Sequence, residues 1–221
     1  MLSNIKIYIN KDTGINILKS ILATFLMGTA INLFVSCELG SDPMTIFLDG
    51  FNRTTGVELS LTTQVLNIIL LIIGFIINRK LIGINTIINV ISLGICTELP
   101  NYIIQPLNLA SQEIFVRIFA MITAQLLLSI SLAWLQTFNK GISNMDAILF
   151  YVIDKCKIKY RTAKIVYDMI FIISGYLLGG IVGLGTIFSL LTTGYLIETI
   201  RKIIDLIQEK RRGIKNEREY C

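Results

Sequence analysis

Six long apolar stretches alternate with short polar segments along the chain. The stretches cover residues 15–37, 61–78, 83–104, 114–138, 162–180 and 184–204. A helix that crosses a bilayer core of about 30 Å needs about 20 mostly apolar residues, and each stretch suits that length. Uninterrupted apolar runs such as 68–77 exclude the alternating strands of a membrane β-barrel. Because backbone polar groups must pair internally in lipid, the pattern predicts an all-α integral membrane protein with six transmembrane helices.

The second half of the chain repeats the first. The segment 83–86 recurs one hundred positions later as 183–186, and another block recurs 101 positions later. The matched residues are Gly94 and Gly194, Glu98 and Glu198, Gly40 and Gly141, Met44 and Met145, and Asn67 and Asp168. Each copy holds three spans, and an odd number of spans turns the second copy upside down in the bilayer. We therefore expect two inverted three-helix repeats, at 15–105 and 114–204, as in transporter folds.

Basic residues mark one side of the predicted membrane protein. They lie before the first span and after the second, fourth and sixth spans, and only Arg53 and Arg117 depart from this pattern. By the positive-inside rule these segments are cytoplasmic. We expect a cytoplasmic N-terminus at 1–14 and a basic cytoplasmic tail at 205–221. The net charge of +5 then reflects topology and does not indicate binding to nucleic acid.

A glycine-containing break follows the first span of each copy and precedes a short amphipathic segment. Proline presets the first turn of a helix, and an Asp or Asn before it caps the exposed amides. About 11 residues at 1.5 Å each reach only about 16 Å. Each short helix is therefore an amphipathic connector at the headgroups or a half-helix that re-enters the membrane, and we narrowly favour the connector. The break residues are Gly40, Asp42 and Pro43 in the first copy and Gly141, Asn144 and Asp146 in the second.

Tight turns join the second span to the third and the fifth to the sixth, so each pair forms an antiparallel hairpin. Small residues recur at these turns and along the spans that follow, where they let backbones approach closely. We favour a packing role for them over the lining of a solute path. These residues are Gly83, Thr86 and Gly94 in the first copy and Gly183, Thr186 and Gly194 in the second.

Three acidic residues fall inside predicted spans, where a charge costs about 2.5–3.5 kcal/mol on insertion scales. Asp168 lies about 9 Å from the start of its span, and its counterpart in the first copy is the neutral Asn67. Glu98 and Glu198 occupy equivalent positions, although long side chains there also have the option of reaching an interface. Intramembrane carboxylates bind protons, cations or polar solutes. We therefore predict a solute or ion pathway at Asp168, Asn67, Glu98 and Glu198.

The sequence gives no indication of catalysis or of a metal site. It contains no histidine, no G-x-S-x-G or H-E-x-x-H motif and no P-loop. Its four cysteines show no CxxC or other metal-binding spacing. We expect no enzymatic activity, no catalytic residues, no metal and no cofactor. The expected partners are the lipid bilayer, a small solute and a coupling ion, and an oligomer is compatible with the sequence.

The chain resembles the YczE/YyaS/YitT family of bacterial integral membrane proteins. The resemblance extends over residues 15–204, and only a short basic tail follows, as in the compact YczE-like branch of the family. It implies a multi-pass protein of the bacterial cytoplasmic (inner) membrane and names no substrate. The residues that carry it are 28–30, the break at 40–43, the turn at 83–86 with Asn89 and Gly94 after it, and 183–186.

The inverted repeat and the intramembrane carboxylates together predict a function. They favour a secondary transporter or exporter of a small solute, with its pathway at the interface between the repeats. The alternative is a membrane scaffold or accessory protein of a biosynthetic or secretion system, because the resembling family has no established substrate. A polar cavity between the repeats would favour transport.

Overall fold

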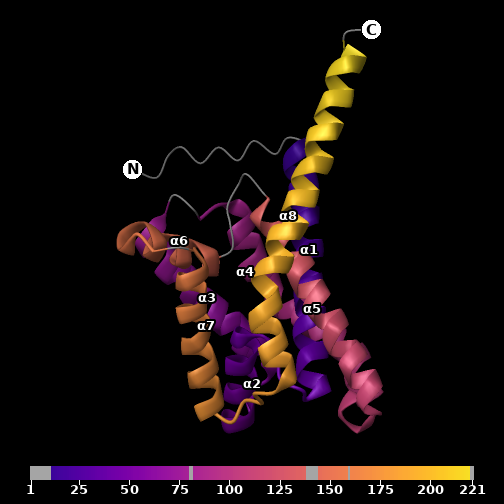
Figure 1. Cartoon of the computed structure of the whole chain (residues 1–221), viewed down its shortest axis with the longest axis vertical. Helices are drawn as coiled ribbons and strands as arrows, with labels where there is room; N and C mark the ends of the chain where they lie inside the picture. Colours follow the sequence, from indigo (N-terminus) through magenta and orange to yellow (C-terminus); the bar gives the residue numbers. More distant parts are fainter. Residues whose placement is uncertain (1–10, 80–81, 138–143, 159, 220–221) are drawn as a thin grey trace.

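The computed structural model describes residues 11–79, 82–137, 144–158 and 160–219. Within these ranges the chain is helical and contains no strand, which confirms the all-α prediction (Figure 1). The long helices are α1 (Lys11–Cys37), α3 (Leu59–Asn78), α4 (Ile84–Ile104), α5 (Ile114–Gln136), α7 (Tyr160–Leu177) and α8 (Leu184–Glu219). The short helices are α2 (Pro43–Thr55) and α6 (Asn144–Cys156), with 3-10 turns at Gln105–Leu107 and Leu109–Ser111.

Four segments of the described chain are long and apolar enough to cross a membrane. They are Ile17–Cys37, Leu59–Ile77, Thr86–Ser111 and Ile114–Gln136. The predicted fifth and sixth spans coincide with α7 and with the first part of α8, which are less apolar. Lys164 and Asp168 lie within α7, and the first part of α8 contains two glycines, several threonines and Glu198. These compositions indicate a membrane protein, with four spans recognised by length and hydropathy.

Equivalent helices of the two sequence copies pack in the same way. α1 packs against α4 and α5 packs against α8, while α1 and α5 contact each other in the middle of the bundle. The short helices cross over: α2 packs along α7, and α6 packs along α3. Figure 1 shows the two short helices toward opposite ends of the bundle. Each short helix is thus supported by a long helix from the other half of the chain.

The first short helix is a buried element of the bundle. Its N-terminus forms as predicted, with Pro43 in the first turn and the Asp42 carboxylate accepting a hydrogen bond from the Thr45 backbone N–H at 3.4 Å. Close glycine contacts hold it to α7: a Cβ added at Gly50 would lie 2.4 Å from the Gly175 carbonyl oxygen. Such backbone proximity requires small residues. The burial of α2 against α7 differs from the amphipathic connector at the headgroups that the sequence favours. The sequence does not indicate this packing, because the glycine that meets Gly50 lies on a helix distant in the chain.

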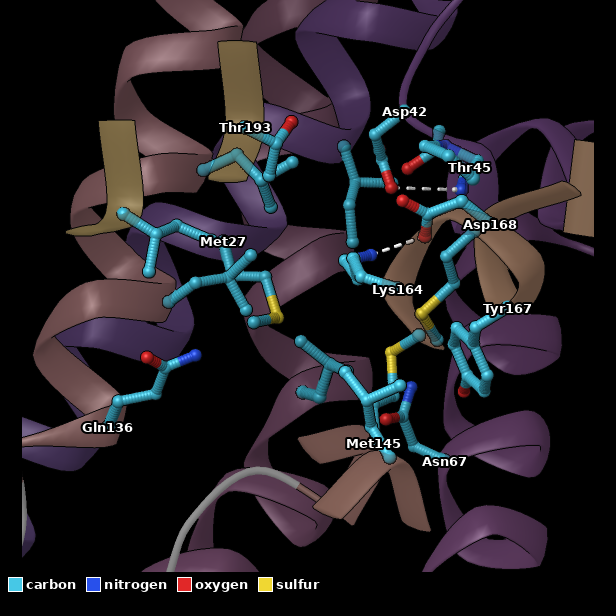
Figure 2. Close-up of a pocket in the computed structure, with 18 of the residues that line it drawn as sticks. Met27, Asp42, Thr45, Asn67, Gln136, Met145, Lys164, Tyr167, Asp168 and Thr193 are labelled. Carbon is cyan, nitrogen blue, oxygen red and sulfur yellow. Dashed lines mark hydrogen bonds and ion pairs between the residues drawn. The ribbon is translucent and has the colours of Figure 1, made fainter. Parts of the chain in front are cut away.

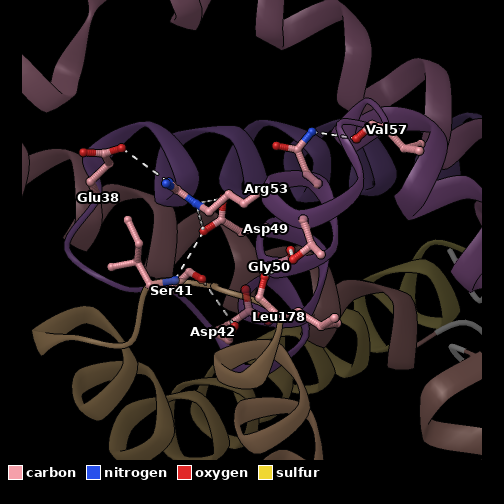
Figure 3. A network of polar contacts seen from close by, with 11 residues as sticks. Glu38, Ser41, Asp42, Asp49, Gly50, Arg53, Val57 and Leu178 are labelled. Atoms are coloured by element: carbon pink, nitrogen blue, oxygen red, sulfur yellow. Dashed lines mark hydrogen bonds and ion pairs between the residues drawn. The ribbon is translucent and has the colours of Figure 1, made fainter.

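A polar network anchors the other end of α2 (Figure 3). The Arg53 guanidinium donates from Nε to both carboxylate oxygens of Asp49, at 2.9 and 2.8 Å, and also contacts Glu38 at 3.3 Å. Asp49, which is 5% exposed, accepts a hydrogen bond from the Ile181 backbone N–H at 3.4 Å. Thr54 donates to the Leu178 carbonyl. These contacts tie α2 to the end of α1 and to the turn between α7 and α8.

The repeated turn motif has the same local structure in both copies. The Thr86 hydroxyl accepts a hydrogen bond from the Gly83 N–H at 3.2 Å, and Thr186 accepts one from Gly183 at the same distance. Gly183 also contacts the other half, since a Cβ there would lie 2.5 Å from the Leu39 carbonyl oxygen. The later glycines differ. A Cβ at Gly94 would meet Gln64 at 2.8 Å, whereas one at Gly194 would meet nothing within 4 Å.

Candidate functional site

A cavity of about 70 Å³ lies in the middle of the bundle, where the N-termini of α2 and α6 approach the long helices. Every one of the eight α-helices contributes at least one lining residue. A cavity needs roughly 10–15 Å³ of such volume to hold one water. The space therefore suits several waters or a small solute.

Many of the lining residues occupy equivalent positions in the two sequence copies. Four pairs are separated by 101 positions, which is the repeat offset found in the sequence: Met27 and Leu128, Ile31 and Leu132, Met44 and Met145, and Asn67 and Asp168. A fifth pair, Leu93 and Thr193, is separated by 100 positions. The cavity thus lies where matching surfaces of the two copies face each other.

Three charged side chains line the cavity: Asp42, Lys164 and Asp168 (Figure 2). Lys164 and Asp168 lie one turn apart on α7 and form an ion pair. The pair is largely shielded from solvent, with side chains 24% and 8% exposed. Figure 2 shows the Asp42 side chain directed toward this pair from the start of α2. The first half of the chain therefore brings one carboxylate to an ion pair of the second half.

Asp42 is the least satisfied of the three charged groups. Its Oδ2 accepts the hydrogen bond from Thr45, whereas its buried Oδ1 has no hydrogen-bond partner. Burial raises the pKa of this carboxyl above its ordinary value of 3.8, while the hydrogen bonds from Thr45 and the Lys164 ammonium lower it. Only 9% of the residue is exposed, so a proton, a cation or a hydrogen-bond donor in the cavity would stabilise its free oxygen.

Uncharged polar side chains around the cavity are held by hydrogen bonds within their own helix or to a neighbouring helix. The Asn67 side-chain amide donates to the Thr63 carbonyl at 2.9 Å. Asn89 donates to the Thr24 hydroxyl at 2.8 Å, which links α4 to α1. Thr193 accepts a hydrogen bond from Gln125 at 2.9 Å, which links α8 to α5. Such anchoring fixes the orientation of the polar groups that face the cavity.

The structure separates the four predicted pathway residues into two groups. Asp168 and Asn67 line the cavity, whereas Glu98 and Glu198 are exposed away from it. The Glu98 carboxylate accepts a hydrogen bond from the Tyr102 hydroxyl at 3.1 Å, and Glu198 pairs with Lys202 at 2.9 Å.

The structure describes the predicted break residues of the first copy. Asp42 and Pro43 line the cavity, and Gly40 lies close to Gly183. Gly141 lies outside the described residues, as do the side chains of Asn144 and Asp146.

Sequence reasoning missed Lys164 as a site residue. Its position one helical turn before Asp168 was the available signal, because residues four apart on a helix lie on the same face. By charge alone it belongs with the basic residues that follow the fourth predicted span. Met27, Tyr167 and Thr193 also line the cavity and carry no distinctive pattern in the sequence. Among the described residues, His, Cys, Asp and Glu form no group of three or more that would hold a metal ion.

Comparison with known proteins places the chain in a family. Residues 15–202 match the "Family of unknown function (DUF6198)". The chain belongs to the DUF6198 family. An uncharacterized protein of Haemophilus influenzae is 21% identical over 184 residues, which cover 83% of this chain and 82% of the relative. No solved structure matches the chain. The region shared with DUF6198 contains all the residues that line the cavity.

Proposed function

We propose that this DUF6198 protein is a secondary transporter of a small solute, with its binding site in the central cavity. The observation that carries the proposal is the cavity itself, lined by equivalent residues of both sequence copies and by three charged side chains. Ionisable groups inside a membrane protein are costly and are typically functional. Transporters built from inverted repeats bind their substrates at the repeat interface, where short or broken helices end.

The proposed topology has six spans in two inverted repeats, with both ends in the cytoplasm of a bacterium and the chain in its inner membrane. The surfaces of α7 and α8 support their assignment as the fifth and sixth spans. α7 exposes Ile170 and Leu177, and α8 exposes Ile187 and Leu191, with exposed fractions between 59% and 79%. Large exposed apolar side chains suit lipid contact. The resemblance to the compact YczE-like branch is consistent with this arrangement.

The two short helices act as re-entrant half-helices in this proposal. The Asp42 end of α2 lies at the cavity beside the middle of α7, whereas Thr54, at the other end of α2, contacts Leu178 just beyond the end of α7. α2 thus runs from the interior of the bundle back to one edge. Its N-terminal dipole then faces the cavity, where it stabilises the negative charge of the capping Asp42 carboxylate.

A rocking motion of one half against the other would open the cavity to each side in turn. Asp42 belongs to the first half, and Lys164 and Asp168 belong to the second. Their spacing changes when the halves move, so a solute that contacts both halves binds the two conformations with different affinity. Such a difference is what couples binding to conformational change.

The test is a flux assay on purified protein reconstituted in liposomes. Gradients of primary amines, amino acids, monocarboxylates and alkali ions are imposed one class at a time, and currents and internal pH are recorded. We expect one class to give flux that falls at least about 10-fold in Asp168→Asn, because a charge-assisted contact is lost. Asp154→Asn, which neutralises an exposed carboxylate, should match the wild type.

Two results would overturn the proposal. Flux that is the same in Asp168→Asn as in the wild type would remove the cavity from the solute path. Absence of flux for all four classes, in protein shown to be folded and correctly inserted, would favour the non-transporting accessory role.

A further inference from the structure

The charges that line the cavity define which ligands it can neutralise. With all groups ionised, Asp42 and Asp168 carry two negative charges and Lys164 carries one positive charge. The other described residues that line the cavity come from all the α-helices of the described chain. They carry no charge at neutral pH. The described residues that line the cavity therefore carry one uncompensated negative charge. A bound monovalent cation would bring the net charge of the lining and ligand to zero. A monovalent anion would double the negative charge, and a divalent cation would make the net charge positive.

The uncompensated charge belongs to Asp42. Asp168 already has Lys164 as its ion-pair partner, while Oδ1 of Asp42 is buried and has no hydrogen-bond partner. A carboxylate oxygen without a donor is unfavourable in a buried site. An ammonium group supplies N–H donors and a positive charge together, so it would stabilise this oxygen in both respects.

The rest of the described lining surface is mostly apolar, although six uncharged polar residues also contribute to it: Thr45, Asn67, Asn89, Gln136, Tyr167 and Thr193. Three methionines, Met27, Met44 and Met145, and the leucine and isoleucine side chains of five helices surround the charged end. A bare alkali ion needs oxygen ligands to replace its whole hydration shell, whereas most of the described lining surface is apolar. An alkylammonium ion suits both parts of the site, because its ammonium contacts carboxylates and its carbon chain contacts methionine and leucine. Methionine adapts its shape to such small apolar groups.

We propose that the cavity binds a small primary amine in its ammonium form, with Asp42 as the main acceptor and Asp168 as the second. This inference rests on the proposed transport site and specifies its substrate class. The volume of about 70 Å³ limits the ligand to a few heavy atoms, such as ethylammonium. A proton on Asp42 satisfies the same negative charge, so protons and amine compete for the site.

The test measures binding separately from transport. Thermal unfolding of the detergent-purified full chain is followed with increasing ethylammonium chloride, and with sodium chloride, choline chloride and sodium acetate at the same ionic strength. A ligand that binds the native state raises Tm with its concentration. We expect ethylammonium to raise Tm beyond all three comparison salts. The gain should disappear in Asp42→Asn and persist in the exposed control Asp154→Asn.

Asp42→Asn is a suitable variant because asparagine is an equally good helix N-cap, which preserves the start of α2. If that variant does not fold, calorimetric titration of ethylammonium into Asp168→Asn and Asp154→Asn gives the same comparison. An equal gain with sodium, an equal gain in Asp42→Asn, or no gain with ethylammonium would overturn the inference. Ethylammonium binding without flux would leave this inference intact and refute the transport proposal. Flux of another solute without ethylammonium binding would support the transport proposal and refute this inference.

Discussion

Thr63 and Asn67 on α3 are the repeat counterparts of Lys164 and Asp168 on α7. Thr63 lies 101 residues before Lys164, and Asn67 lies 101 residues before Asp168. In the first copy the two side chains are neutral, and Asn67 donates to the Thr63 carbonyl at 2.9 Å. In the second copy the same two positions form an ion pair. Asn67 and Asp168 both line the cavity. The comparison shows a shared backbone plan in which one copy supplies the charge and the other supplies neutral hydrogen-bonding groups.

The short helices show a second side of the same comparison. Asp42 immediately precedes α2, and its carboxylate caps the helix and is directed toward the ion pair of the other copy (Figure 2). Lys164 therefore has two carboxylates near it, one from each half. The charge asymmetry of the long helices and the position of Asp42 together leave one uncompensated negative charge among the described residues that line the cavity.

Erasing the asymmetry should have the largest effect. Asp168→Asn makes the two copies alike at this position and leaves Lys164 without its partner. The ammonium is then expected to turn to Asp42 and cancel the remaining negative charge. We expect ethylammonium affinity and solute flux to fall about 10- to 100-fold, measured by calorimetry and by liposome assay. Unchanged affinity would mean that the ion pair has no role in binding.

Removing the positive member should sharpen the asymmetry. Lys164→Met leaves two carboxylates unbalanced in the cavity, so we expect the free energy of unfolding to fall by about 1–3 kcal/mol. Ethylammonium should restore part of this loss and raise Tm more than it does for the wild type. Denaturation with and without the amine measures both effects. A smaller gain than in the wild type would contradict the charge balance.

The packing of α2 against α7 gives a predicted effect on stability alone, without a change in the charges of the cavity. Gly50→Ala places a Cβ 2.4 Å from the Gly175 carbonyl oxygen, and overpacking of this kind costs about 1–3 kcal/mol. Gly194→Ala is the matched control, because its Cβ meets nothing within 4 Å. There we expect a gain of about 0.5–1 kcal/mol, since alanine is the better helix former. Equal effects of the two substitutions on Tm would contradict the close approach of α2.

The smallest effect is expected at the two equivalent glutamates. Glu98→Gln and Glu198→Gln change exposed side chains that pair with Tyr102 and Lys202 on their own helices. We expect no measurable change in flux or in ethylammonium binding. Loss of flux in either variant would extend the pathway beyond the cavity.

Periodicity and composition allowed much of the fold to be predicted. Apolar length gave the helices, and the Gly-Ser-Asp-Pro break gave the start of α2 at Pro43 with Asp42 as its cap. The repeat offset also singled out Asn67 and Asp168, which both line the cavity. These features depend on local sequence or on direct comparison of the two copies, so a single chain is enough to see them.

Other features depend on contacts between distant segments. The burial of α2 arises from Gly50 meeting Gly175 and Gly180, and the sequence does not state which glycines meet. Glu98 and Glu198 are repeat counterparts, just as Asn67 and Asp168 are, yet both glutamates are exposed. Equivalence in sequence fixes a helix position but not the face that packs inward, and a one-residue difference rotates a side chain by about 100°.

The crossed pairing of the short helices has a consequence for biogenesis. α2 ends at residue 55, and the helix that covers its buried face, α7, ends at residue 177. Ribosomes add about 5–20 residues per second, so α2 waits roughly 6–24 s for its partner to be synthesised. During that interval Gly50 and Asp42 lack the contacts that α7 provides. The first half is therefore expected to depend on insertion factors that shield it until the second half arrives.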